Sequence, residues 1–200
     1  MSTNNKRFTT DLTQDRYKIT AEGPISDIFR NRGLNDLHTA AAFIRQLPYG
    51  RNPDKHRPET IFTDGCATCS TKHAILKNLA LEHDWDEIGL FIGIFRMNGT
   101  NTPKVKEVLD ANRLQHIPEA HCYLKINGEI LDITTVQSGP EQFVPDLMEE
   151  LEILPSQITD FKIAYHKAIL RIWLESNPEH ALSLDQIWSV REQCIRSLSI

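Results

Sequence analysis

Hydrophobic residues recur at helical spacing in the first part of the chain, where polar stretches separate them into short windows. The spacing predicts helices near 24–32, from a cap at Asn35 or Asp36 to Pro48, and from about Cys69 through Leu81. Turn-forming residues accumulate from Pro48 to Pro58 and predict a loop there. Residues 1–20 are polar and weakly patterned, and we expect an irregular arm.

The spacing of the hydrophobic residues along the chain changes from residue 88 onward. The run Ile88–Arg96 is rich in apolar residues and predicts a buried strand. Thr102-Pro103 is typical of a helix start, and apolar positions follow it as far as Leu109. Two β-rich runs, His121–Ile126 and Glu129–Thr134, flank Asn127-Gly128 and predict a hairpin with a type I′ turn.

Helical patterns return in the last third of the chain. We expect one short helix within Pro140–Pro155, then helices over about 158–175 and about 184–197. Ser183-Leu-Asp-Gln186 fits a capping box at the start of the last one. Trp173 and Trp188 on these helices are typical of core packing or of a homo-oligomer interface. Helices, a central group of strands and helices again predict an α+β fold.

Composition limits the classes of protein to consider. The chain has 200 residues, of which 40% are hydrophobic and 24% charged, which is ordinary for a globular protein and predicts a single domain over 1–200. Its 22 Lys+Arg against 27 Asp+Glu give a net charge of −5, with no basic block or tail. This argues against general binding to nucleic acid or to an anionic membrane.

Four cysteines need an explanation in a chain with no apolar stretch of signal-peptide or membrane-span length. We therefore expect a cytoplasmic location, where thiols stay reduced. In that setting cysteines indicate chemistry, metal binding or core filling more than a disulfide framework.

Three residue types required for thiol catalysis follow one another as Cys69, His121 and Asp132. Cys69 stands where turn residues give way to helical periodicity, and the N-terminus of a helix favours a thiolate. A base must share the proton of that thiol, and an acceptor must orient the base. The pattern predicts Cys69 as nucleophile, His121 as general base and acid, and Asp132 as the residue that orients the imidazole.

The predicted hairpin brings the last two groups together. A two-residue turn at Asn127-Gly128 pairs Ile126 with Glu129, so His121 at the start of one strand would face Thr134 on the next. Asp132 then lies on the diagonal of the same face, roughly 7–8 Å from His121 between Cα atoms. That distance is within reach of the two side chains.

These residues resemble the motifs of the transglutaminase-like superfamily. The matching segments are Gly65-Cys-Ala-Thr-Cys-Ser-Thr-Lys-His-Ala-Ile-Leu76, His121-Cys-Tyr-Leu and Asp132-Ile-Thr134. The resemblance covers about 35–135 and implies a papain-like core with the Cys helix packed on a small antiparallel sheet, elaborated by helices over about 140–200. It departs from the family at Tyr123, where Trp is usual, and Cys66 is a second candidate nucleophile.

The resemblance implies a cysteine-dependent hydrolase or acyltransferase of the peptidase, deamidase or transglutaminase type, acting on a peptide, a protein or a small amide. No cofactor and no metal are required for that chemistry. A family member without activity, which binds peptides or a partner protein, is the alternative without catalysis. Cys66-x-x-Cys69 is also the usual first half of a structural zinc site, to which His121-Cys122 would contribute. Adjacent strand residues point to opposite faces, which argues against that site.

Overall fold

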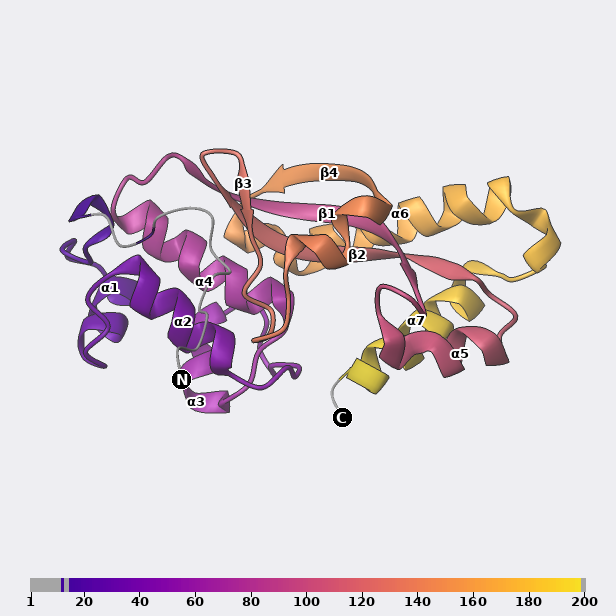
Figure 1. The fold of residues 1–200 in the computed structure, drawn as a ribbon, viewed down its shortest axis with the longest axis horizontal. Coiled ribbons are helices and arrows are strands. Elements are labelled where there is room, and N and C mark those ends of the chain that lie inside the picture. The colour runs from indigo at the N-terminus through magenta and orange to yellow at the C-terminus, as the bar shows by residue number, and fades with distance from the viewer. Residues whose placement is uncertain (1–11, 13–14, 199–200) are drawn as a thin grey trace, which may run out of the picture.

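The computed structural model describes residues 12 and 15–198, which form an antiparallel sheet with helices packed against it (Figure 1). Within this part of the chain the sheet has the strand order β3-β2-β1-β4. Its strands are β1 (Ile88–Asn98), β2 (His116–Ile126), β3 (Glu129–Leu131) and β4 (Leu147–Ile153). The α-helices are α1 (Pro24–Arg30), α2 (Leu37–Gln46), α3 (Ile61–Asp64), α4 (Cys69–Glu82), α5 (Lys106–Ala111), α6 (Asp160–Ser176) and α7 (Leu184–Leu198). The predicted α+β class is confirmed.

Local capping explains where several helices begin. The Asp36 side chain accepts a hydrogen bond from the backbone N–H of Thr39 at the start of α2. At the start of α7, Ser183 and Gln186 form the expected capping box, with reciprocal bonds of 2.8 and 3.2 Å. Each bond satisfies an N–H group that has no partner within the first turn. The helices expected near 24–32, from 36 to 48 and from Cys69 onward are confirmed with small shifts at their ends.

The hairpin has the predicted register but is shorter than expected. Ile126 pairs with Glu129, and Asn127 and Gly128 both have positive φ, as a type I′ turn requires. However, β3 ends at Leu131, so His121 has no partner on β3 and Asp132 lies in the loop after that strand. β2 begins at His116, which corrects the prediction that His121 starts its strand.

The segment between Pro140 and Pro155 differs from the one short helix that we expected there. It contains two 3-10 helices, Pro140–Gln142 and Val144–Asp146, and then the strand β4, which pairs with β1 at the edge of the sheet. Leu147–Ile153 is rich in Glu, Leu and Met, which favour helices, and most of it is exposed. Pairing with β1 outweighs that local preference, and charged residues are common on an edge strand.

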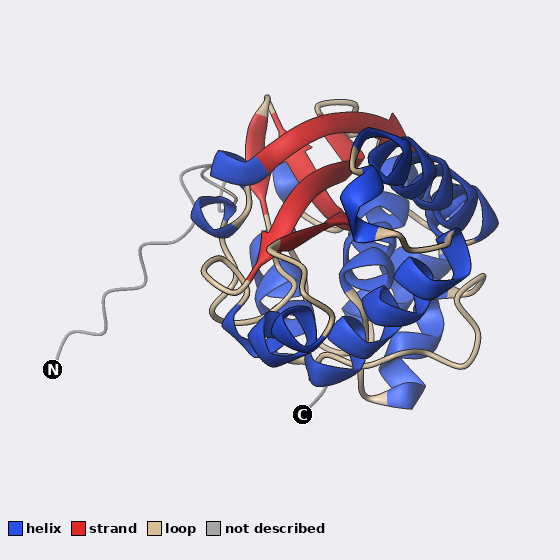
Figure 2. Cartoon of the chain, turned by 90° about the vertical axis from the view of Figure 1, so that its right-hand side faces the viewer, coloured by secondary structure: helices blue, strands red, loops and turns tan. Residues whose placement is uncertain are grey.

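Two hydrophobic clusters lie on the helix-covered parts of the sheet. The first includes Leu76 and Ile75 of α4 with Ile92 and Cys122 of the sheet. The second joins the far ends of β1 and β2 to α5, α6 and α7. Figure 1 shows α1 to α4 under one half of the sheet and α5 and α7 under the other half, and Figure 2 shows the strands on one side of this helical layer. Cys69, the first residue of α4, lies at the edge of the first cluster.

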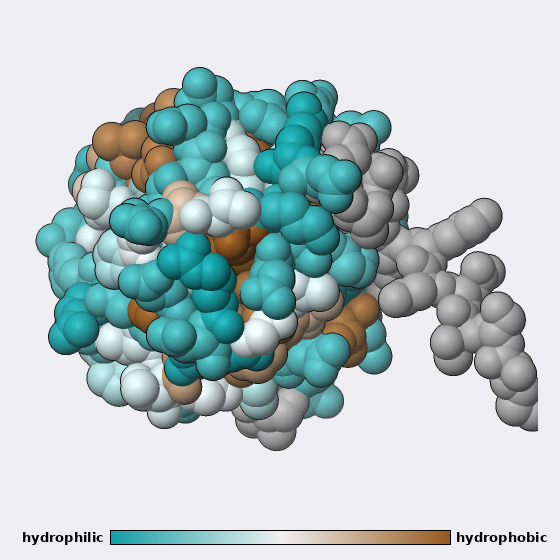
Figure 3. All heavy atoms as spheres, turned by 90° about the vertical axis from the view of Figure 1, so that its left-hand side faces the viewer, coloured by the Kyte–Doolittle hydropathy of each residue, from teal (hydrophilic) through white to brown (hydrophobic). Residues whose placement is uncertain are grey.

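The end of the molecule that faces the viewer in Figure 3 is mainly hydrophilic, with small apolar patches. Among the described helices, none combines the length and apolar character needed to cross a membrane. The irregular arm expected at 1–20 lies mostly outside the described residues. In its described part, Leu12, Tyr17 and Ile19 are buried.

Candidate active site

Cys69 occupies the first turn of α4. The Thr68 side chain accepts a hydrogen bond from the backbone N–H of Thr71, and the Thr71 hydroxyl accepts one in return from the N–H of Thr68. This capping box fixes the turn that holds Cys69. The first N–H groups of a helix have no carbonyl partner and form the positive end of the helix dipole. The Cys69 thiol, 8% exposed, therefore lies where a thiolate is favoured.

His121 and Asp132 contact each other directly. His121 Nε2 lies 2.9 Å from Asp132 Oδ2, while Asp132 Oδ1 accepts bonds from the Thr134 backbone N–H and hydroxyl at 2.9 and 2.6 Å. Burial favours the neutral acid, but the charge and hydrogen bond of His121 outweigh it and lower the pKa of Asp132 to about 2. Asp132 is therefore an anion that fixes the orientation of the His121 ring.

The Cys69 thiol and the His121 ring have opposite pKa shifts. The pKa of Cys69 lies well below its ordinary value because of a hydrogen bond from Cys122 and, against the effect of burial, the positive charges of Lys162 and His121. Burial lowers the pKa of His121, but Asp132 and Cys69 raise it to about 10. The pair is thus a thiolate beside an imidazolium at neutral pH.

His73 lies on the next turn of α4 and contacts both sides of the site. Its Nδ1 donates to the Cys69 carbonyl at 2.7 Å, and its Nε2 accepts from the Ile133 backbone N–H at 2.9 Å. Because the carbonyl can only accept and the N–H can only donate, the ring is neutral. Burial lowers the pKa of His73 to about 4, in agreement with this tautomer. His73 thereby joins the first turn of α4, which holds Cys69, to the loop that holds Asp132.

Two further cations hold this loop in place. The buried Lys72 ammonium donates to the carbonyls of Leu47 and Thr134, the second at 2.8 Å. Arg45 of α2 donates to the Thr135 and Ser138 carbonyls at 2.9 and 2.7 Å. The loop after β3 therefore owes its position to α2 and α4 and not to pairing within the sheet.

On its other side, Cys69 faces Lys162 of α6. The Lys162 ammonium donates to the Ser70 hydroxyl at 2.7 Å and lies 4.0 Å from Cys69 Sγ. The Ser70 hydroxyl lies 3.5 Å from Cys122 Sγ, and a hydrogen bond with Cys69 raises the pKa of Cys122 well above its ordinary value. Cys122 therefore stays a thiol and donates to the Cys69 thiolate.

Two cavities meet at Cys69. The first, about 290 Å³, is rich in basic side chains from the 48–58 loop, α6 and α7, and we call it the cationic cavity. The second, about 380 Å³, contains His121 and Asp132 together with Phe95, Met97 and Phe143, and we call it the apolar cavity. Tyr49, Cys69, Glu119 and Ile195 line both cavities. A bound molecule could therefore pass over the thiol from one cavity to the other.

Tyr49, from the 48–58 loop, lines both cavities at this junction. Burial and the nearby Cys69 thiolate both raise the pKa of its phenol, which therefore remains protonated. No described residue forms a hydrogen bond with its hydroxyl. The sequence left two interpretations of this loop, a turn-rich surface segment, which we favoured, and a wall of the cleft; the structure places Tyr49 and Arg51 in the wall of the cationic cavity.

The predicted site residues lie close together, but Asp132 reaches His121 from a different segment than we expected. His121 contacts Asp132 as expected, but through the loop after β3 and not across a strand diagonal. Cys66 takes no part in the contacts between His121 and Asp132. Its thiol packs against Gly50 and lies 4.0 Å from the Arg51 carbonyl oxygen. The described residues contain no group of three or more His, Cys, Asp or Glu placed to hold a metal ion. They therefore give no support to a zinc site on Cys66 and Cys69.

Sequence reasoning missed Lys162, Glu119 and Arg191, and it considered Cys122 only as a zinc ligand and not as a hydrogen-bond donor to Cys69. Compared with models of known protein families, with curated proteins and with solved structures, the chain shows no significant match. The site itself is therefore the basis for a functional argument.

Proposed function

We propose that this protein is a cysteine-dependent enzyme that cleaves or transfers an amide or acyl group through a thioester on Cys69. The observation that supports it best is the single chain of contacts from the Asp132 carboxylate through His121 to the Cys69 thiol, at the junction of two cavities. Structural histidines and cysteines are common in cores, but here three elements converge on a charged pair beside open space.

The first half of the reaction follows from the charges of the pair. The Cys69 thiolate attacks the carbonyl carbon of the substrate, and the new C–S bond gives a tetrahedral oxyanion. His121 then donates its proton to the leaving amine nitrogen, the C–N bond breaks and a thioester remains. Asp132 keeps the ring oriented through Nε2, which leaves Nδ1 for the proton transfer.

The second half consumes the thioester. Neutral His121 removes a proton from water or from an acceptor amine, which attacks the thioester carbon. The C–S bond breaks, the Cys69 thiolate leaves and the pair returns to its charged state. Water gives hydrolysis, as in a peptidase or deamidase, and an amine gives transfer, as in a transglutaminase.

The oxyanion needs donors that are present before the reaction. The backbone N–H of Cys69 is in the first turn of α4, where no helical carbonyl accepts it. The Tyr49 hydroxyl is protonated, lines both cavities and has no partner among the described residues. We assign these two groups as the oxyanion donors.

The arrangement supports a transglutaminase-like core. Cys69 at a helix start, His121 on a strand and Asp132 follow one another in the order that the resemblance implies, although Asp132 lies directly after β3 and not on it. The helices α6 and α7 would then be an elaboration that closes the cationic cavity.

The test is acylation by p-nitrophenyl acetate, followed by peptide mapping. We expect a burst of one equivalent of p-nitrophenolate, an acetyl group on the Cys69 peptide, and loss of both in Cys69→Ala. Cys66→Ala is the matched control and should retain the burst. A folded protein with no burst would favour the alternative of a binding domain without catalysis. A burst with the acetyl group on the Cys66 peptide would make Cys66 the nucleophile and contradict the assignment of Cys69.

A further inference from the structure

The cationic cavity has more positive charge than its own carboxylates can balance. Five basic side chains line it, Arg51, Lys55, Lys162, Lys167 and Arg191, against the two carboxylates Glu119 and Glu192. Arg191 binds Glu119 at 2.8 Å, and Arg51 binds Glu192 at 2.7 Å. Both carboxylates are therefore already paired with arginines, and the three lysines remain.

Each lysine is placed differently. Lys162 is buried against Ser70 and faces the Cys69 thiolate. Lys167 lies 4.9 Å from the centroid of the Trp188 ring, a contact that leaves its charge unneutralised. Lys55 forms no ion pair with a described residue, and burial together with Arg51, Arg191 and Lys162 lowers its pKa. The positive charges that line the cavity therefore disfavour the protonated form of Lys55.

The start of α4 adds to this field. Thr68, Ser70 and Thr71 of its first turn line the same cavity, and the N-terminus of this 14-residue helix attracts negative charge. The balance of charge in the cationic cavity changes further during the proposed reaction. When the Cys69 thiolate becomes a neutral thioester, Lys162 no longer faces a negative charge. The net charge of the cavity then becomes more positive by one unit.

We infer that the substrate bears a carboxylate or phosphate group on one side of its reactive carbonyl, and that the cationic cavity binds this group through Lys55 and Lys167. The inference rests on the proposed function and narrows its substrate class. The carbonyl lies at Cys69, the anionic group lies among the lysines, and the opposite part of the substrate lies along Phe95, Met97 and Phe143 in the apolar cavity.

The experiment measures how fast iodoacetamide alkylates Cys69 in the presence of succinate, inorganic phosphate or neutral succinamide, at constant ionic strength. We expect the anions to slow alkylation and succinamide to leave it nearly unchanged. Stronger protection by succinate would identify a carboxylate site, and stronger protection by phosphate a phosphate site.

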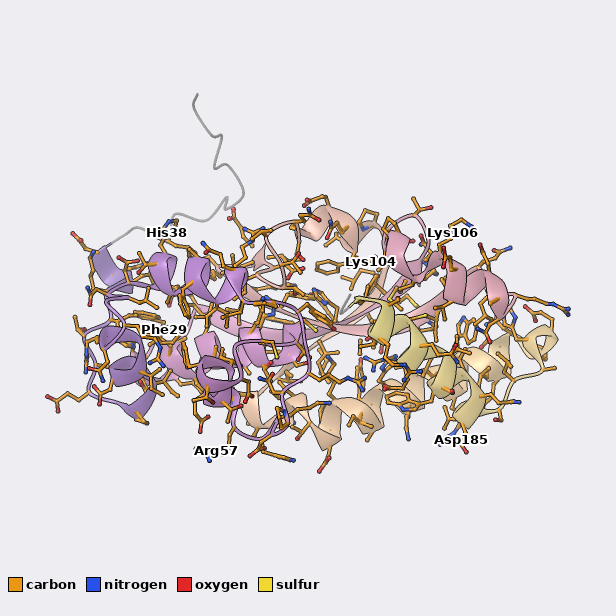
Figure 4. All side chains as sticks on the ribbon, turned by 90° about the horizontal axis from the view of Figure 1, so that it is seen from below. Phe29, His38, Arg57, Lys104, Lys106 and Asp185 are labelled. Atoms are coloured by element: carbon orange, nitrogen blue, oxygen red, sulfur yellow. The ribbon has the colours of Figure 1, made fainter. Side chains whose placement is uncertain are left out.

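Three variants assign the effect to the cavity. Lys55→Gln and Lys167→Gln should each raise the anion concentration for half protection about fivefold. Lys106→Gln makes the same charge change on α5, where Lys106 pairs with Asp110, and should leave it unchanged (Figure 4). Equal protection by succinamide, or equal shifts in Lys55→Gln and Lys106→Gln, would overturn the inference.

This inference and the proposed function fail in different ways. A reactive Cys69 without anion protection would overturn only the anion site. If Cys69 is inert to iodoacetamide, the proposed function fails, and the anion site is judged by thermal unfolding instead. Phosphate should then raise the melting temperature of the wild type more than that of Lys55→Gln; equal shifts would overturn the site as well.

Discussion

Two histidines on opposite sides of Asp132 have opposite charge states. On the helix side, His73 Nε2 is 3.6 Å from Asp132 Oδ1; on the cavity side, His121 Nε2 is 2.9 Å from Asp132 Oδ2. The pKa of His73 falls to about 4, because burial dominates, whereas the pKa of His121 rises to about 10, because Asp132 and Cys69 outweigh burial. Proximity to a carboxylate therefore does not decide the charge of a histidine by itself.

The partners of the second ring nitrogen account for the difference between the pKa values of His73 and His121. His73 uses both nitrogens for backbone groups, and a second proton would displace the Ile133 N–H. The His121 side chain retains 15% exposure, contacts the carboxylate with one nitrogen and has the thiol on its other side. A neutral ring suits a structural link between two segments, and a charged ring suits proton transfer.

The largest expected effect is that of His121→Gln on acylation. Without the imidazolium, the Cys69 thiolate loses a stabilising charge and Cys69 reverts towards the less nucleophilic thiol, so the acylation rate by p-nitrophenyl acetate at about pH 7 should fall about 1000-fold. His56→Gln, on the exposed loop, is the control and should leave the rate unchanged. A reduction of less than about tenfold would show that His121 is not the base.

The main effect of His73→Leu should be on the stability of the fold. The change leaves the buried Ile133 N–H without its acceptor, so the free energy of unfolding should fall by about 3 kcal/mol in urea denaturation. His56→Leu should change it by less than about 0.5 kcal/mol. An equally small effect of His73→Leu would mean that His73 does not hold the Asp132 loop.

The two histidines should also destabilise the fold in opposite pH ranges. The pKa of His73 is lowered, so the unfolded chain binds its proton first, and stability should fall by about 2 kcal/mol between pH 8 and pH 5. The pKa of His121 is raised, so its contribution is complete below about pH 6.5 and is lost as the pH rises toward about 10. Urea denaturation across this range measures both, and the acid-side loss should be about 2 kcal/mol smaller in His73→Leu, where His116 and His166, whose pKa values burial also lowers, keep their own share of it. An acid-side loss of the same size in the variant and the wild type would contradict the assignment.

Cys122→Ala should have the smallest effect. It removes the thiol that donates to the Cys69 thiolate but leaves Lys162 and His121 in place. The rate of Cys69 alkylation at about pH 6 should fall by about tenfold. Cys194→Ala, which removes a thiol in the second hydrophobic cluster, is the control. An unchanged rate in Cys122→Ala would show that the two cations alone hold the thiolate.

Much of the candidate site could be predicted from local signals. The turn residues before Cys69, the helical stripe after it and the Asn127-Gly128 turn are short-range features, and they indicate Cys69, His121 and Asp132 as site residues. The turn fixed the register, although the strand that was expected to hold Asp132 ends one residue earlier.

The remainder depends on contacts between distant segments. Lys162 is 93 positions from Cys69, and Glu119 is 72 positions from Arg191, so no periodicity or motif relates them. The edge strand β4 was missed because its residues favour a helix and only pairing with β1 makes it a strand. Sequence pattern therefore points to Cys69 and His121, and tertiary packing supplies the charges around them.

The most direct test of the central claim is the pH dependence of iodoacetamide alkylation at Cys69, followed by peptide mapping. A Cys69 thiolate paired with the His121 imidazolium predicts rapid, selective alkylation well below the ordinary thiol pKa of about 8.5, with a midpoint that moves up in His121→Gln. A midpoint at or above that value in the wild type, or one that does not change in His121→Gln, would contradict it.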